Sequence, residues 1–338
     1  MRDRDASWGH ALWERLLWGG VLLLLVAPTG CDHAIDGVAP SATDSPVEVD
    51  GLFRGLGRPL RVVCTTAQVA DIVKNVGGGD VEVDTLMGDG VDPHLFTATA
   101  GDVHRLRAAD LIFYNGLHLE GRLADTLHDL GATKPSIAVT TGLVDQEPER
   151  LRRPAEFEGM YDPHVWLDVA LWHRCADYVA AELCRLDPER AEGYRQRAAA
   201  YGSELNALDE ECRRQIAEIP VRQRVMVTAH DAFGYFGRAY DVEVRGLQGI
   251  STADEADLVT LGALIDLLVE RGVKAVFVES SVSEKYVQAL VEGCAARGHD
   301  VRIGGELYSD AMGPDGTPEG TYVGMVRHNV DTIAHALK

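Results

Sequence analysis

The sequence predicts an α/β protein with two βα lobes, each built on a parallel central sheet, that are joined by one long spine helix. Short apolar runs alternate with helical patterns in both halves of the 338-residue chain, which is typical of parallel sheets covered by helices. Between the halves, a single apolar stripe at helical spacing continues for roughly thirty residues. Polar residues suited to ligand binding follow extended segments in each half, and this pattern predicts a site in the cleft between the lobes.

The composition is that of a globular protein, since 46% of the residues are hydrophobic and 25% are charged. A chain of this length is expected to form two domains. Its formal net charge of −21 disfavours nucleic acid and an anionic membrane surface as main partners.

The N-terminus has the features of an export signal. An apolar stretch at 16–28 follows a segment with several arginines and stops shortly before Cys31. It is too short to span a bilayer and has the length of the apolar region of a signal peptide. A small residue followed by cysteine resembles a bacterial lipoprotein signal, so we expect a signal peptide at 1–31 with Cys31 lipidated; plain secretion is the alternative. The Gly-, Pro- and Ser-rich residues 32–59 are expected to form a flexible tether.

The first lobe is expected over residues 60–186 and begins with a strand at 60–65. A helix at 67–76 ends at three consecutive glycines, and 81–86 alternates as a second strand. The other elements expected here are helices at 97–109, 119–130 and 165–186 and strands at 111–114 and 136–140.

The spine helix is expected over residues 187–219, with Asp187 as its N-cap and Pro188 at its first position. At 1.5 Å per residue this helix is roughly 45 Å long, enough to lie across two small domains. A coiled-coil dimer is the alternative, but alanine and tyrosine are poor residues for a zipper core, and we expect a monomer. The stripe consists of residues that recur at spacings of three and four: Ala191, Tyr194, Ala198, Tyr201, Leu205, Leu208 and Cys212.

The second lobe is expected over residues 220–338 and repeats the same alternation. Its strands are expected at 225–228, 242–247, 275–279 and 300–303, and its helices at 254–271, 284–297 and 321–337.

Two histidines occur in the same short motif in the first half of the chain. His94 and His164 each end an Asp-Pro-His segment. Proline fixes its own φ and biases the preceding aspartate to an extended conformation, so the direction of each imidazole is restricted in advance. The aspartates or nearby carbonyls could orient the second ring nitrogen. The repetition predicts that both histidines bind one ligand.

The second half of the chain supplies two further candidates. His230 ends the apolar strand that begins at Val225, and Asp310 follows the last strand of the lobe. Asp231 is expected to cap the next helical turn rather than to bind. Glu279, at the end of another strand, is the main rival for the carboxylate position, and we interpret it as a hydrogen-bond partner of a ligand rather than as a ligand.

Three imidazoles and one carboxylate predict a site for one divalent metal ion. Four protein ligands resemble a closed binding site, whereas catalytic zinc normally keeps one position open for water. The sequence lacks the motifs of zincin proteases, P-loop ATPases and Rossmann dehydrogenases.

At these residues the chain resembles the metal-binding lipoproteins of bacterial ABC importers for zinc and manganese, the cluster A-I solute-binding proteins. The resemblance covers about residues 60–338. It rests on motifs that occur in the family's order: GVDPH at 90–94, ADLIFYNGLHLE at 109–120, DPHVWLD at 162–168, TAHDAFGYF at 228–236, LQGIST at 247–252, FVESSV at 277–282 and ELYSDAMG at 306–313.

The resemblance implies that His94, His164, His230 and Asp310 bind Zn²⁺ or Mn²⁺ as transported ligand. It also implies two lobes with restricted hinge motion and a binding protein rather than an enzyme. The implied partners are an ABC permease, its ATPase subunit and the membrane, reached through a lipid anchor. The implied location is extracytoplasmic, either periplasmic or at the cell surface.

Two departures from the family's subgroups bear on the metal. Many manganese-dedicated members have glutamate at the position of His230. Many zinc-dedicated members have a His-rich loop before the second ligand, whereas residues 131–162 contain no histidine. The chain therefore resembles members for which both metals are plausible cargo.

Two other classes of function stay open from the sequence. A membrane-anchored extracytoplasmic zinc hydrolase would need a general base near the metal, such as Glu279 or Glu306. A surface adhesin is the other alternative, because exported lipoproteins are often exposed at the cell surface.

Overall fold

A computed structural model describes residues 50–157, 159–253 and 257–338. These residues belong to one compact unit, which contains two α/β lobes and a long helix, as the sequence predicted. Three predictions lie outside the described residues: the signal peptide at 1–31 with its lipidated Cys31, residues 32–49 of the tether, and the start of a helix at 254. The prediction that the tether continues to residue 59 was wrong, because the backbone of Gly51 and Phe53 donates hydrogen bonds to the end of α5 (Val169–Leu186), and Phe53 packs against the hydrophobic core.

The first lobe is built on a four-stranded parallel sheet with the order β2-β1-β3-β4. The two central strands are buried on both faces, because their side chains are apolar at nearly every position. The strands are β1 (Leu60–Cys64), β2 (Val81–Thr85), β3 (Leu111–Tyr114) and β4 (Ser136–Ala138).

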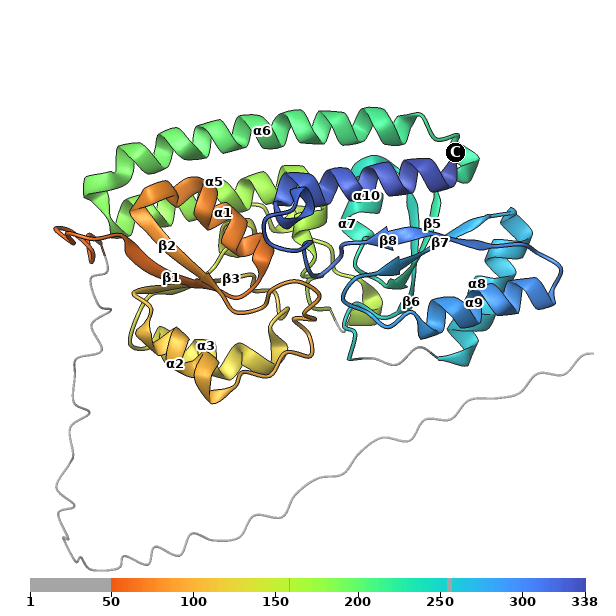
Figure 1. Cartoon of the computed structure of the whole chain (residues 1–338), viewed down its shortest axis with the longest axis horizontal. Helices are drawn as coiled ribbons and strands as arrows, with labels where there is room; N and C mark the ends of the chain where they lie inside the picture. Colours follow the sequence, from red (N-terminus) through yellow and green to blue (C-terminus); the bar gives the residue numbers. More distant parts are fainter. Residues whose placement is uncertain (1–49, 158, 254–256) are drawn as a thin grey trace, which may run out of the picture. The chain divides into compact units, whose positions relative to one another are not determined.

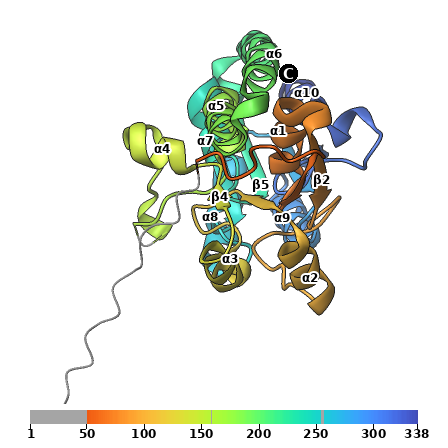
Figure 2. The ribbon, with the colours of Figure 1, turned by 90° about the vertical axis from the view of Figure 1, so that its left-hand side faces the viewer.

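Helices cover both faces of this sheet (Figure 2). Val62 and Phe113 face the larger core, formed with α1 and α5, whereas Val63 and Ile112 face a smaller core formed with α2 and α3. The helices of this lobe are α1 (Ala67–Gly77), α2 (Ala100–Ala108), α3 (Ala124–Gly131), α4 (Thr141–Gln146) and α5 (Val169–Leu186).

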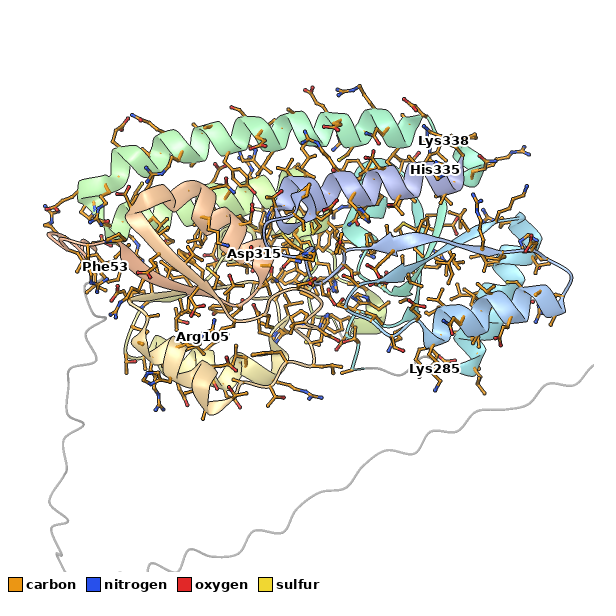
Figure 3. All side chains as sticks on the ribbon, viewed as in Figure 1. Phe53, Arg105, Lys285, Asp315, His335 and Lys338 are labelled. Carbon is orange, nitrogen blue, oxygen red and sulfur yellow. The ribbon has the colours of Figure 1, made fainter. Side chains whose placement is uncertain are left out.

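The second lobe repeats this arrangement with two parallel strand pairs, β5-β6 and β7-β8, and β5 lies beside β7. In Figure 3, Lys285 at the start of α9 marks the side of this lobe that is turned away from α6. The elements are β5 (Val225–His230), α7 (Gly234–Tyr240), β6 (Glu243–Gln248), α8 (Leu258–Arg271), β7 (Ala275–Glu279), α9 (Lys285–Ala296), β8 (Arg302–Leu307) and α10 (Tyr322–Leu337). Among the described residues, no helix combines the length and the apolar character needed to cross a membrane.

The long helix α6 (Ala191–Ala217) runs alongside helices of both lobes (Figure 1). It contacts α1 and α5 of the first lobe and α7 and α10 of the second. All seven residues of the predicted stripe are buried, which confirms the predicted orientation of the helix. One helix therefore packs against the cores of both lobes.

The prediction that Asp187 caps this helix was wrong. Pro188 begins a short 3-10 turn, Pro188–Arg190, and the Asp187 side chain makes no capping hydrogen bond. Instead its carboxylate accepts hydrogen bonds from the Tyr194 hydroxyl at 2.9 Å and from Arg190 at 2.7 Å. The buried Tyr194 phenol and the partly exposed Arg190 guanidinium compete successfully with the helix backbone for this acceptor.

Other predicted boundaries differ from the structure because of capping. The helix predicted at 97–109 begins at Ala100, since Thr99 and Asp102 form a reciprocal capping box. The helix predicted at 165–186 is interrupted, because Asp168 accepts hydrogen bonds from the backbone of α5 and starts that helix anew. Asp231 does not cap α7, whose N-cap is Phe233.

The last strand was predicted at 300–303 but spans Arg302–Leu307. It continues through two glycines, Gly304 and Gly305, that pack against α10 and β7. This longer strand carries the chain to the loop that contains Asp310.

Candidate metal centre

Four predicted ligands come together at the facing ends of the two sheets. His94 lies in the loop after β2, His164 lies in the loop before α5, His230 is the last residue of β5, and Asp310 follows β8. One donor atom from each residue lies within 4.8 Å of the others, and all four residues are buried. The carboxyl ends of parallel strands meet at one edge of a sheet, and here two such edges face each other.

The Asp310 carboxylate is at the centre of the cluster. Its Oδ1 lies 3.2 Å from His164 Nε2, and its Oδ2 lies 3.3 Å from His230 Nε2 and 3.8 Å from His94 Nε2. Both oxygens are buried and have no hydrogen-bond donor that meets normal geometry. A buried carboxylate is costly unless a positive charge balances it. This orphaned acceptor among three Nε2 atoms fits a divalent cation.

A carboxylate holds the His164 ring through Nδ1, the ring nitrogen that does not face Asp310. Asp162 Oδ1 lies 2.8 Å from His164 Nδ1 and also accepts a hydrogen bond from the His164 backbone at 3.0 Å. The other oxygen of Asp162 accepts a hydrogen bond from Arg152 at 2.5 Å. A proton held on Nδ1 leaves the lone pair of Nε2 for a metal ion.

His230 also has a carboxylate beside its Nδ1, from Glu279, but as a close contact rather than as an aligned hydrogen bond. Glu279 Oε2 lies 2.6 Å from His230 Nδ1, and Glu279 Oε1 accepts a hydrogen bond from the His230 backbone at 2.9 Å. The structure places this carboxylate at Nδ1, whereas Nε2 is the atom near Asp310. Glu279 therefore lies at the ring nitrogen of His230 that is turned away from Asp310.

His94 is anchored differently. Asp92 Oδ1 accepts a hydrogen bond from the His94 backbone at 2.8 Å, but the other oxygen of Asp92 accepts one from Thr252 Oγ1 at 2.5 Å. Thr252 follows β6 in the second lobe. The aspartate of this loop thus connects the two lobes.

The environments of His94 and His164 shift their pKa values in opposite directions. Burial lowers the pKa of His94 to about 3. Burial also opposes protonation of His164, but its hydrogen bond with Asp162 and the charges of Asp162 and Asp310 outweigh it and raise the pKa of His164 to about 9. Without a metal ion, His164 carries a proton at neutral pH and His94 does not.

The second lobe follows the pattern of His164. Burial opposes protonation of His230, but the charges of Glu279 and Asp310 outweigh it and raise its pKa well above the usual value. Burial would raise the pKa of Asp310, yet the neighbouring histidines hold it well below its usual range. Protons on two imidazoles therefore balance the Asp310 carboxylate, and a metal ion would displace them.

Several residues that support this cluster were not predicted from the sequence. Trp166 donates a hydrogen bond from Nε1 to the Ser309 carbonyl at 2.8 Å, so it joins the loops of His164 and Asp310. Arg152 was not singled out, and Thr252 appeared only as the last residue of the motif LQGIST. Trp166 could have been suspected, because it lies only two residues after a predicted ligand. Thr252 lies 160 positions from Asp92, and although Arg152 lies only 10 positions from Asp162, no helical or strand periodicity links either pair.

Comparisons with known proteins agree with this architecture. Residues 62–336 match the model of the family described as zinc-uptake complex component A, periplasmic (ZnuA). The chain is 45% identical over 322 residues to the manganese-binding lipoprotein MntA of Bacillus subtilis (strain 168), covering 95% of this chain and 99% of MntA. It is 50% identical over 281 residues to the zinc-binding protein TroA of Treponema pallidum (strain Nichols), covering 83% of this chain and 89% of TroA.

The fold is shared as well. The solved structure of the periplasmic zinc-binding protein TroA from Treponema pallidum matches with a TM-score of 0.79 and 49% sequence identity, over 82% of this chain and 99% of that chain. The family model spans both lobes and all four residues of the cluster. From the match of sequence and fold together, we conclude that the chain belongs to the family of the periplasmic zinc-uptake component ZnuA.

Proposed function

We propose that this protein is the extracytoplasmic solute-binding component of an ABC transporter, which captures a divalent metal ion, Zn²⁺ or Mn²⁺, and delivers it to a membrane permease. The observation that carries the proposal is the buried cluster of His94, His164, His230 and Asp310. Relatives named as metal-binding lipoproteins and as a metal ABC transporter substrate-binding lipoprotein support it.

In this proposal the four residues of the cluster bind the transported ion directly. Asp162 and Glu279 orient two of the imidazoles through Nδ1, which leaves Nε2 available. The ligands come two from each lobe, so the ion cross-links the lobes. The proposed lobes are residues 60–186 and 220–338, with the spine at 187–219.

A binding role, rather than hydrolysis, follows from the donor set in the same proposal. Four buried protein ligands leave little room for the activated water that a catalytic zinc site requires. The rival general base, Glu279, is engaged by the backbone and ring of His230. Nothing in the described residues favours the adhesin alternative over transport.

The proposed location is outside the cytoplasm, with the chain attached to a membrane through a lipid on Cys31 and a tether that ends before residue 50. Its proposed partners are the permease and ATPase subunit of the transporter, and the protein acts as a monomer. The relatives named as lipoproteins support this location.

The test is metal content and metal binding of the purified protein. We expect one Zn²⁺ or Mn²⁺ per chain in protein purified without added metal, and a 1:1 stoichiometry in titration of the stripped protein. Asp310→Ala should bind far more weakly than Glu279→Ala, because Asp310 contributes a donor atom. A wild-type protein that binds neither metal would overturn the proposed function. A Glu279→Ala variant that binds metal more weakly than Asp310→Ala would overturn the assignment of the ligands.

Zinc should bind more tightly than manganese. With three imidazoles and one carboxylate the site is rich in nitrogen, and affinity at such sites rises from Mn²⁺ towards Cu²⁺, with Zn²⁺ well above Mn²⁺. His230→Glu replaces a nitrogen donor with a hard oxygen donor and should narrow the preference for zinc. Competition titrations on both proteins measure it, and an unchanged ratio would mean that His230 does not bind the ion.

A further inference from the structure

Three of the four ligand loops are joined to one another by buried hydrogen bonds across the lobes. Trp166, two residues after His164, donates to the Ser309 carbonyl next to Asp310 at 2.8 Å. The Tyr322 hydroxyl of α10 in turn donates to the Trp166 carbonyl at 2.6 Å. All five residues are buried, so the loops of His164 and Asp310 form one well-packed contact between the lobes.

The loop of His164 is also tied to the element that follows His230. The hydroxyl of Tyr235 in α7 donates a hydrogen bond to the Asp162 carbonyl at 2.9 Å and accepts one from the Arg152 backbone N–H at 3.0 Å. Tyr235 is fully buried. Relative movement of the lobes at this place would leave several buried polar groups without partners, which is costly.

The loop of His94 lies at the edge of this contact. Its hydrogen bond to the second lobe joins the side chains of Asp92 and Thr252 at 2.5 Å, and it lies in a partly buried position. Asp92 is only half-buried. Water can replace a broken bond there at lower cost than in the buried contact. The same Asp92 carboxylate holds the backbone of His94, so this bond couples the position of His94 to the second lobe.

We infer that the Asp92–Thr252 hydrogen bond is a latch that holds His94 on the captured ion, so that release of the ion begins when this bond breaks. The inference deepens the proposed function and rests on it. Opening of the latch would free the His94 loop while His164, His230 and Asp310 keep their mutual contacts. Thr252 is therefore a positioning residue that acts through Asp92 on the rate of metal release.

The test is the rate of zinc dissociation from the Thr252→Val variant of the full chain. Valine has the shape of threonine without the hydroxyl. We expect zinc to leave about tenfold faster, as the loss of one hydrogen bond to a charged acceptor predicts, while the association rate changes little. Stopped-flow transfer of zinc to an excess of a chromophoric chelator measures the rate.

Two matched variants separate a latch from a general loss of stability. Thr252→Ser keeps the hydroxyl and should restore the wild-type rate. Thr260→Val removes a similar bond, from Thr260 Oγ1 to Asp257 at 2.7 Å, within the second lobe. Without metal, the Thr252→Val and Thr260→Val variants should melt at similar temperatures, and zinc should leave faster only from the Thr252→Val variant.

A double-mutant cycle with Asp92→Asn completes the test. If Thr252 acts through Asp92, the Thr252→Val change should have little further effect on the rate in the Asp92→Asn background. Three outcomes would each overturn the latch. The effects of the two substitutions on the dissociation rate could multiply fully, Thr252→Val could release zinc at the wild-type rate, or Thr260→Val could release it equally fast. Failure of the wild-type protein to bind zinc or manganese would instead overturn the proposed function.

Discussion

The two Asp-Pro-His segments share a tripeptide but have different tertiary roles. In both, the aspartate accepts a hydrogen bond from the backbone of its histidine, at 2.8 Å in the segment of His94 and 3.0 Å in that of His164. In addition to this shared turn, the Asp162 carboxylate forms hydrogen bonds with the ring of its own histidine, His164, and with Arg152. Asp92 instead accepts a hydrogen bond from Thr252 in the other lobe.

This difference shows that one local motif can serve two purposes. The turn depends on proline and on the short reach of aspartate, and both segments have these. The use of the second carboxylate oxygen depends on which side chains pack nearby. One segment therefore orients an imidazole, and the other joins the lobes.

The largest effect is expected from removing the better supported histidine. His164→Ala should weaken zinc binding at least about 100-fold, since one of four ligands accounts for a corresponding share of a typical zinc-binding free energy. His94→Ala should weaken it severely but less, because that ring has no carboxylate behind it. Titration against a competing chelator measures both. His335→Ala, an exposed position on α10, is the control, and a loss of affinity in that variant would contradict the site.

A smaller effect is expected from the two aspartates. Asp162→Asn should lower zinc affinity about 10- to 100-fold, as is usual for a group that orients a metal-binding histidine. Asp92→Asn should lower it less, because Asp92 does not contact the ring. The same titration ranks the two variants. If Asp92→Asn proved the weaker binder, the two segments would not differ as the structure indicates.

The pH dependence should also distinguish the segments. The pKa of His164 is raised to about 9, so at pH 7 this ring is protonated without metal and must lose its proton when an ion binds. Affinity should therefore rise with pH up to about 9, by about tenfold per pH unit for each proton released. Calorimetry in buffers of different ionisation enthalpy counts these protons. Asp162→Asn removes the anion that holds the proton and should weaken the dependence; an unchanged proton count would contradict this.

The smallest effect concerns thermal stability. The ion binds residues of both lobes, so zinc at about 100 times its Kd should stabilise the native protein by about 2.7 kcal/mol and raise the melting temperature by about 5–10 °C. Scanning calorimetry should show one transition that moves as a whole. A transition in which only part of the heat absorption moves would mean that the ion binds to one lobe alone.

Much of the fold was predictable from the sequence, because the signals are local. Apolar strands such as β1 and β5 and the periodic stripe of α6 depend on residues a few positions apart, and the structure confirms them. Predicted helix starts were less accurate, because the Asp168 cap and the Thr99 capping box compete with the apolar pattern.

By itself, the sequence determined the chemistry of the candidate site: three imidazoles and one carboxylate, each after an extended segment, and their division between two lobes. The sequence also suggested that the neighbouring aspartates and Glu279 support the ligands, but only the tertiary structure decided which ring each carboxylate contacts and how the ligand loops are joined. Asp92 and Thr252 are 160 positions apart, and Trp166 and Ser309 are 143 apart. Such bonds form because packing of the lobes against α6 and α10 brings particular loops into contact, and no periodicity along the chain encodes that proximity.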